Sequence, residues 1–192
     1  MKRAIEDKKL KVSFYNPRDF ADNAYKRIDR PPYAGGPGMV IQAEPVIKAI
    51  QKAKGQRPKV KIIFLSPFGK QFTNSYASGV AKKFKDVIIV SGRYEGIDAR
   101  VKKVFKMEEV SVGPFVLTGG ELPAMLLIDV ISRQVKGILG NFGSIEESRT
   151  ASPDVYTRPE SFKYKGKLYK VPKILLGGNH AKIEAWKSKR IK

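Results

Sequence analysis

Apolar residues recur between positions 44 and 135 in two alternating patterns, one with helical spacing and one as short uninterrupted runs. Helical spacing predicts helices at residues 44–54, 73–84, 98–105 and 122–135. The short runs are rich in β-branched residues, as is typical of buried strands, and they cover residues 60–65, 87–90 and 109–112. Alternation of strand and helix predicts parallel pairing with right-handed crossovers, so the expected fold class is α/β with a parallel sheet.

The helix expected at residues 122–135 is apolar on nearly every side, unlike a surface helix. Its apolar positions are Leu122, Ala124, Met125, Leu126, Leu127, Ile128, Val130 and Ile131. Such a helix is normally buried, and we expect it to lie between the core and a second subunit.

The composition changes after Gly140, where residues 141–152 become poor in large apolar side chains. We therefore divide the chain into an α/β domain (1–140), a flexible linker (141–158) and a small basic helical lobe (159–192). Within residues 161–192 there are ten Lys or Arg residues and one acidic residue, Glu184. A helix is expected near residues 181–190, capped by Asn179.

The charge balance points to a polyanionic partner. The 192 residues include 38 Lys or Arg and 18 Asp or Glu, a formal net charge of +20. Nucleic acid is favoured over an anionic membrane because no basic amphipathic helix with a broad apolar face stands out. Solubility alone is the weaker explanation for so one-sided an excess. No apolar run approaches the ~20 residues of a membrane span, no secretory signal is visible and no cysteine is present to form a disulfide-linked partner, so a cytoplasmic protein is expected.

A glycine-containing loop follows each of the three predicted strands, at residues 65–69, 91–96 and 112–120. Ligands of open parallel sheets bind outside the carboxyl ends of the strands, where glycine lets the backbone approach them closely. One such loop is most simply a tight turn, but three in succession favour a pocket lined by main-chain groups. The phosphate-binding and dinucleotide-binding glycine motifs are absent, which disfavours kinase-like enzymes and classical dehydrogenases. A fourth cluster, at residues 33–39, predicts by itself only a flexible turn.

These segments, in this order, resemble the bacterial tRNA (guanine-37-N(1)) methyltransferase family, TrmD. The similarity covers essentially the whole chain, and the matching stretches are residues 16–20, 32–39, 65–67, 92–98, 119–125, 156–160 and 178–181. The resemblance implies a SPOUT-type deep trefoil knot, an obligate homodimer and a tRNA substrate that is methylated at guanosine 37 when guanosine also precedes it. It also implies S-adenosylmethionine as cofactor and an association with magnesium.

The same resemblance assigns cofactor-binding residues to the three loops. They are Leu65, Ser66, Pro67, Gly69, Ser91, Gly92, Tyr94, Glu95, Gly96, Ile97, Val112, Gly113, Pro114, Phe115, Val116, Leu117, Gly119, Gly120 and Pro123.

Guanine N1 carries a proton at neutral pH, so its methylation needs a general base and is helped by a cation near O6. By resemblance, Glu147 stands where the family has an aspartate base, with Glu146 as the alternative if the register slips by one; a solvated acidic pair is the simpler explanation. Arg133 matches an arginine that the family holds near the target base. The alternative is a purely structural role, in which Arg133 complements the dipole at a helix C-terminus. Glu95 is a candidate for holding magnesium or the amine of the cofactor, or for local pairing alone. The sole histidine, His180, is expected to be structural, and no transition-metal site is expected.

The chain also departs from the family. The family has an extra strand and helix before the position of Met1, and its C-terminal domain continues beyond Arg190, so we expect a truncated C-terminal lobe. Proline replaces an acidic residue at position 114, which removes a backbone donor. A catalytically silent or differently targeted RNA-binding protein of the same superfamily is therefore the alternative. Retention of the cofactor loops together with an arginine and a carboxylate favours the enzyme.

Overall fold

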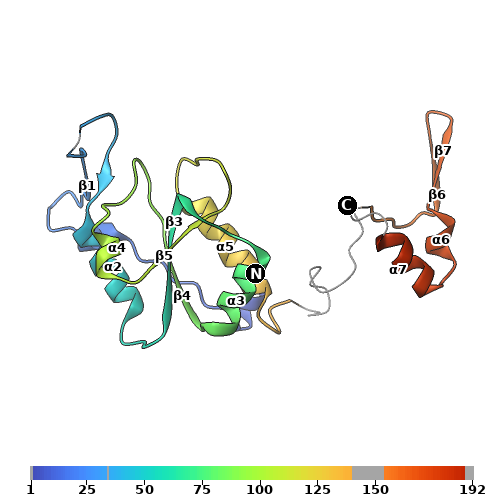
Figure 1. Cartoon of the computed structure of the whole chain (residues 1–192), viewed down its shortest axis with the longest axis horizontal. Helices are drawn as coiled ribbons and strands as arrows, with labels where there is room; N and C mark the ends of the chain where they lie inside the picture. The colour runs from blue at the N-terminus through green and yellow to red at the C-terminus, as the bar shows by residue number, and fades with distance from the viewer. Residues whose placement is uncertain (1, 34, 140–153, 189–192) are drawn as a thin grey trace. The chain divides into compact units, whose positions relative to one another are not determined.

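The computed structural model describes residues 2–33, 35–139 and 154–188. The chain divides into two compact units, Met1–Gly140 and Asn141–Lys192, and each is considered by itself (Figure 1).

The centre of the first unit is a parallel sheet of three strands in the order β4-β3-β5. The strands are β3 (Val60–Gln71), β4 (Asp86–Val90) and β5 (Glu108–Ser111). Both neighbours pair with β3 in parallel, which confirms the α/β class and the parallel sheet predicted from the sequence.

Helices cover both faces of this sheet (Figure 1). On one face Ile63 packs with residues of α3 (Asn74–Lys83) and α5 (Glu121–Arg133). On the other face Ile62 and Phe64 pack with residues of α2 (Ala43–Lys54) and α4 (Val101–Val104). Successive side chains of a strand point to opposite faces, so the uninterrupted apolar run of β3 supplies both cores.

The helix ends have local causes. Pro45 lies in the first turn of α2, and Gly55 follows its last residue with a φ of 53°. The Thr73 side chain accepts a hydrogen bond from the Tyr76 amide at 3.1 Å and so caps α3.

Two elements differ from expectation. The strand predicted at residues 60–65 continues to Gln71, and the first glycine loop is an irregularity within β3, where the pairing with β5 shifts between Leu65 and Lys70. The helix predicted at residues 98–105 is only four residues long. Asp98 instead forms a turn, in which its carboxylate accepts a hydrogen bond from the Arg100 amide at 2.9 Å.

Helix α5 is buried on one side only. Leu127 is fully buried against the sheet, whereas Leu122, Met125 and Leu126 are 64%, 66% and 42% exposed. The single chain therefore buries the side of α5 that faces the sheet and leaves an apolar stripe open, on the side where a second subunit was expected.

The N-terminal segment precedes α2, and its residues 17–41 lie beside α2 and the second glycine loop. It contains α1 (Lys2–Glu6), the 3-10 helix η1 (Pro17–Phe20) and two short antiparallel strands, β1 (Asp29–Arg30) and β2 (Val40–Ile41). Ile41 at the end of β2 bridges to Ile97. This pairing brings the turn at residues 35–39 next to the loop after β4.

The second unit consists of an antiparallel hairpin, β6 (Ser161–Tyr164) and β7 (Lys167–Lys170), followed by α6 (Lys173–Leu176) and α7 (His180–Ser188). The hairpin is an element of this small basic lobe that was not predicted from the sequence. Asn179 caps α7 as predicted, accepting a hydrogen bond from the Lys182 amide at 3.1 Å. Of the linker expected at residues 141–158, residues 141–153 lie outside the described residues, and residues 154–158 form no helix or strand.

None of the helices described is long and apolar enough to cross a membrane.

Candidate functional site

The three glycine loops line one cavity of about 410 Å³ at the carboxyl ends of the parallel strands. Most of the cofactor-binding residues predicted from the sequence border it. They are Leu65, Ser66, Pro67, Gly92, Tyr94, Glu95, Gly96, Ile97, Val112, Phe115, Val116, Leu117, Gly119, Gly120 and Pro123.

Four predicted residues do not line the cavity: Gly69, Ser91, Gly113 and Pro114. Gly69 instead packs against the backbone of β5. The Ser91 hydroxyl donates a hydrogen bond to the Gly120 carbonyl at 3.1 Å, and the Gly113 carbonyl accepts one from the Ser111 hydroxyl at 2.9 Å. Gly69, Ser91 and Gly113 thus support the walls rather than border the cavity; Pro114 follows Gly113 in the same loop.

The second and third loops touch through their backbones at Gly120. Its amide donates a hydrogen bond to the Gly92 carbonyl at 2.9 Å. A Cβ atom at Gly120 would lie 2.8 Å from the Ser91 Cβ and 3.1 Å from the Gly92 amide nitrogen. The first separation is shorter than real Cβ contacts and the second is tighter than most of them, so only glycine allows the two loops to meet here without a shift.

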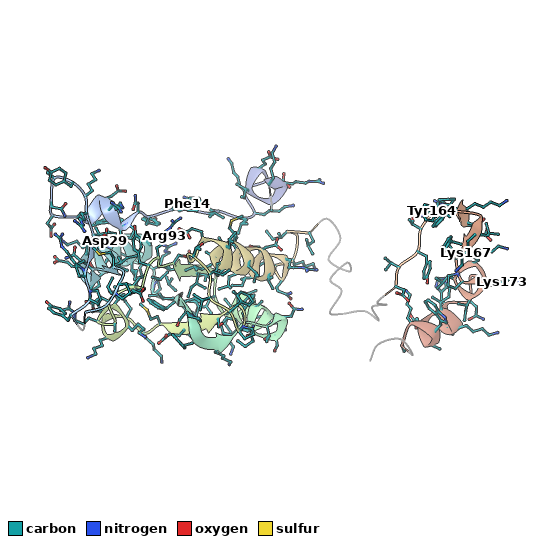
Figure 2. All side chains as sticks on the ribbon, turned by 90° about the horizontal axis from the view of Figure 1, so that it is seen from above. Phe14, Asp29, Arg93, Tyr164, Lys167 and Lys173 are labelled. Carbon is teal, nitrogen blue, oxygen red and sulfur yellow. The ribbon has the colours of Figure 1, made fainter. Side chains whose placement is uncertain are left out.

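An ion pair joins the same two loops at the surface. The Arg93 Nε lies 2.6 Å from a Glu121 carboxylate oxygen, and Arg93 also forms an isolated antiparallel bridge with Gly119 (Figure 2). The hydrogen bond from Arg93 holds the pKa of Glu121 below its usual range, and the same bond raises the pKa of Arg93. Glu121 therefore stays ionised at neutral pH, and the pair is lost only when acid protonates this carboxylate.

A second ion pair lies in the wall of the cavity, where Lys102 is 2.7 Å from Glu109 and its ammonium lies 5.5 Å from the centre of the Phe64 ring. The cavity-lining cations Arg93 and Lys102 are thus both neutralised by a carboxylate. A ligand in this cavity meets main-chain groups and apolar side chains rather than unpaired positive charge.

The fourth glycine cluster, expected to be only a turn, is part of this site. The Glu95 amide donates a hydrogen bond to the Met39 carbonyl at 3.0 Å. Gly38 has a φ of 94°, and a Cβ atom there would lie 2.7 Å from a Glu95 carboxylate oxygen. Glycine at position 38 thus makes room for the Glu95 side chain. Nothing local in the sequence indicates this contact, because it joins segments more than 50 residues apart.

Sequence reasoning also missed lining residues that belong to strands and helices rather than loops. These are Phe64, Lys102, Glu109, Val110 and Ser111. Val110 and Ser111 directly precede a predicted loop residue, and that position is the only sequence signal that could have indicated them.

The proposed catalytic arginine lies elsewhere. Arg133 is the last residue of α5 and does not line the cavity. Helix α5 begins at Glu121, directly after the cavity-lining Gly120. Its 13 residues rise about 1.5 Å each, so Arg133 lies about 18 Å along the helix from Glu121. Glu147 and its alternative Glu146 lie outside the described residues. His180 is exposed at the start of α7.

The described residues contain no group of three His, Cys, Asp or Glu side chains placed to hold a metal ion.

The arrangement can hold a compact ligand that has an apolar ring and several hydrogen-bonding edges. Ile97, Val112 and Leu117 offer apolar surface, and the loops supply amide and carbonyl groups. An adenosine moiety has this combination of properties, and its ring can be recognised by main-chain groups without a charged side chain.

Comparison with known proteins identifies the family. The family model described as tRNA (Guanine-1)-methyltransferase TrmD matches residues 1–192. The chain belongs to this family. It is 41% identical over 194 residues to a tRNA (guanine-N(1)-)-methyltransferase of Geobacter metallireducens, covering 99% of this chain and 77% of the relative. It is 43% identical to the protein of the same name from Pseudoalteromonas atlantica, covering 98% and 71%, and 42% identical to that of Campylobacter jejuni subsp. doylei, covering 97% and 81%.

Replacing Gly120 by alanine tests whether the contact between the second and third loops shapes the cavity. The added methyl group forces the loops apart, so we expect the Kd for S-adenosylmethionine, measured by calorimetry, to rise at least about tenfold, which corresponds to about 1.4 kcal/mol. Gly79→Ala is the matched control, because a Cβ atom at this position in α3 has open space around it. An unchanged Kd for Gly120→Ala would exclude this contact as a determinant of the cavity.

Proposed function

We propose that this protein transfers a methyl group from S-adenosylmethionine to N1 of guanosine 37 in tRNA. One observation carries the proposal: in a TrmD-family chain, three glycine loops at neighbouring strand ends line a single cavity. The net charge of +20 suits a tRNA substrate, because cationic side chains bind phosphates. The cytoplasm, where tRNA is modified, is the proposed compartment.

The cavity fits the methyl donor on the chemistry of its lining. Apolar side chains at Ile97 and Leu117 would contact the adenine ring, and main-chain groups of the loops would bind its polar edges. The sulfonium would supply a methyl group whose carbon an aligned nucleophile can attack, with the thioether as the leaving group. Because Arg93 and Lys102 are both paired with carboxylates, this part of the protein does not repel a positively charged sulfonium.

The trefoil knot is part of the same proposal. Its support is the close contact of the second and third loops, in which the Gly120 amide donates a hydrogen bond to the Gly92 carbonyl and the Ser91 hydroxyl donates one to the Gly120 carbonyl. A segment that passes through a loop must come this close to it, and a glycine at the crossing leaves room for it.

In the proposed mechanism Glu147 accepts the N1 proton of the guanine as its carboxylate. The N1 electron pair then forms the bond to the methyl carbon, and the carbon–sulfur bond breaks with its electrons passing to sulfur. Arg133 would place its guanidinium near O6, where negative charge develops as the proton leaves. Glu146 remains the alternative base.

A homodimer would bring the separated parts together. The apolar stripe of α5 formed by Leu122, Met125 and Leu126 is exposed in the single chain. Because Arg133 lies at the opposite end of α5 from the cavity of its own chain, we propose that a second copy packs on this stripe and offers its Arg133 to that cavity.

Magnesium is proposed only as an ion that accompanies the substrate. Glu95 is the lining carboxylate for which the described residues show no hydrogen bond or ion pair, and it would be the protein group nearest to such an ion. A single carboxylate with waters and substrate oxygens is a common way to bind Mg²⁺.

The substrate is tested with tRNA transcripts that differ only at positions 36 and 37. We expect labelled S-adenosylmethionine to transfer its methyl group to transcripts with guanosine at both positions, and transfer to fall to background when guanosine 37 is replaced. Binding of the donor without any transfer would favour a silent RNA-binding protein. Transfer that ignores position 37 would indicate a different RNA target.

The base is tested by Glu147→Gln, which keeps the shape of the side chain but cannot accept the proton. We expect kcat to fall at least about 100-fold, the lower range of general-base catalysis, with the Kd of the donor nearly unchanged. Glu146→Gln is the matched control and is expected to remain active. Full activity of the Glu147 variant combined with loss in the Glu146 variant would move the base by one residue.

The dimer is tested by Met125→Lys, which places a charge in the exposed stripe of α5. Burying that ammonium without a partner is costly, so we expect sedimentation velocity to show a monomer and methyl transfer to be lost. Val104→Lys is the control, because Val104 is an apolar residue of α4 with 53% exposure outside the stripe. A dimer that survives the substitution at Met125 would rule out this stripe as the interface.

A further inference from the structure

The β6–β7 hairpin of the second unit carries lysines and aromatic rings and little else. Residues 161–170 contain four lysines, three aromatic residues and no acidic residue. Every residue of both strands is exposed. Figure 1 shows the two strands projecting beyond α6 and α7 of the same unit.

The pairing register sorts these side chains onto two faces. Residues directly opposite each other share a face, and the pairs are Phe162 with Tyr169 and Tyr164 with Lys167. Since alternate residues of a strand also share a face, all three rings and Lys167 lie on one side. Lys163, Leu168 and Lys170 lie on the other side.

Two of the rings have a structural use. The Phe162 and Tyr169 rings are stacked, with centroids 5.4 Å apart and planes 14° apart. An isolated two-stranded hairpin is only marginally stable, and a cross-strand aromatic pair of this kind stabilises it.

Tyr164 needs a different explanation. It is 59% exposed, and within residues 154–188 no hydrogen bond of its hydroxyl group is found. Its cross-strand neighbour is Lys167 rather than another ring, so its own ring presents a large apolar surface at the tip of the hairpin (Figure 2).

The turn places further positive charge beside this ring. Lys165 and Gly166 both have positive φ, 46° and 76°, as a two-residue hairpin turn with this twist requires. Asparagine or aspartate is favoured at the first of these positions, so a lysine is there at a conformational cost. Its ammonium lies 5.6 Å from the centre of the Tyr164 ring, and that of Lys167 lies 5.4 Å from the centre of the Tyr169 ring.

Rings flanked by lysines on an exposed ribbon match the chemistry of unpaired RNA. Every base has a flat face that stacks on an aromatic ring, and the adjacent phosphates bind ammonium groups. A duplex buries the faces of its bases, so its phosphates would bind the lysines but no base would stack on the rings. A protein partner could also bury Tyr164 but would need acidic groups to match the four lysines, whereas unpaired RNA supplies base faces and phosphates together.

We infer that the aromatic face of the β6–β7 ribbon is a contact site for unpaired nucleotides of the RNA substrate, with a base stacked on Tyr164 and phosphates bound by Lys165 and Lys167. The inference rests on the proposed function only in taking tRNA as the ligand. The ribbon acts in substrate binding and takes no part in the chemical step.

The main test compares Tyr164→Ala with Tyr164→Phe in the full chain, measuring the Kd for a tRNA transcript by fluorescence anisotropy. Loss of the ring is expected to raise the Kd and the KM for tRNA at least about fivefold, with kcat at saturating tRNA and the Kd for S-adenosylmethionine unchanged. Phenylalanine keeps the ring and is expected to restore the original Kd. Leu168→Ala, on the opposite face of the ribbon, is the matched control and is expected to leave the Kd unchanged.

The lysines are tested by a second pair of variants with the same change of charge. The variants are Lys167→Gln, on the aromatic face of the ribbon, and Lys163→Gln, on the opposite face. Loss of one phosphate contact to a single strand should lower the slope of log Kd against log salt by about 0.7 for Lys167, and by much less for Lys163. Tyr164→Ala should leave this slope unchanged. Equal effects of the two lysines would overturn the assignment of the face.

Competition separates unpaired from paired RNA. An unpaired oligonucleotide should displace the tRNA from the original protein and do so less well from Tyr164→Ala, whereas a duplex of the same composition should compete equally with both. A trypsin digest at the ribbon lysines checks that Tyr164→Ala keeps the hairpin folded. If the hairpin of Tyr164→Ala is unfolded, the test of the ribbon site passes to the tRNA affinities of the Tyr164→Phe and Lys167→Gln variants.

The outcomes for the ribbon and for the enzyme can be told apart. If tRNA binding depends on Tyr164 but no tRNA is methylated, the ribbon site stands and the proposed function falls. If tRNA is methylated while Tyr164→Ala leaves both Kd and KM unchanged, the ribbon site falls alone. The ribbon site would also be overturned if Tyr164→Ala changed the sedimentation of the protein and left its tRNA affinity unchanged. The ribbon would then contact a second copy of the chain.

Discussion

The approach of two backbones at Gly120 is the constraint on which the candidate site depends. The loop after β5 lies against the loop after β4 with no space for a Cβ atom, and the Gly120–Gly92 hydrogen bond and the Ser91 hydroxyl hold it there. The parallel sheet makes this approach possible, because β4 and β5 flank β3 and send their loops to the same edge. The cavity is what remains between three loops that are fixed in this way.

The charges of the protein are divided between two tasks. In the cavity each of the cations Arg93 and Lys102 is balanced by a carboxylate, which leaves an environment suited to a donor that is itself cationic. In the β6–β7 ribbon no acidic residue balances the lysines, which suits phosphates. The net charge of +20 therefore arises outside the lining of the cavity, where two cations stand with two carboxylates.

Prediction from sequence succeeded where the pattern was local or periodic. The parallel sheet followed from short β-branched runs between helical segments, and the cap of α7 from a single asparagine before the helix. It failed where distant segments meet. The turn at residues 35–39 gave no sign that Gly38 would pack on Glu95, and the excursion of β3 at residues 65–69 looked like an ordinary loop after a strand. The hairpin was missed although residues 161–164 alternate polar and aromatic side chains, because each strand is only four residues long and its two-residue turn is Lys-Gly rather than Asn-Gly or Asp-Gly.

The order of the glycine loops, the sign of the charge and the family resemblance were present in the sequence itself, because each depends only on which residues follow one another. The fold class also followed from the sequence, since the spacing of apolar residues that distinguishes strands from helices is a property of a short stretch of chain. Only the tertiary structure decided that the loops share one cavity and that Gly38 belongs to it. It also decided that Arg133 does not line the cavity of its own chain and that three rings lie on one face of a ribbon. These features arise from strand register and from contacts across the fold, which no local stretch of sequence contains.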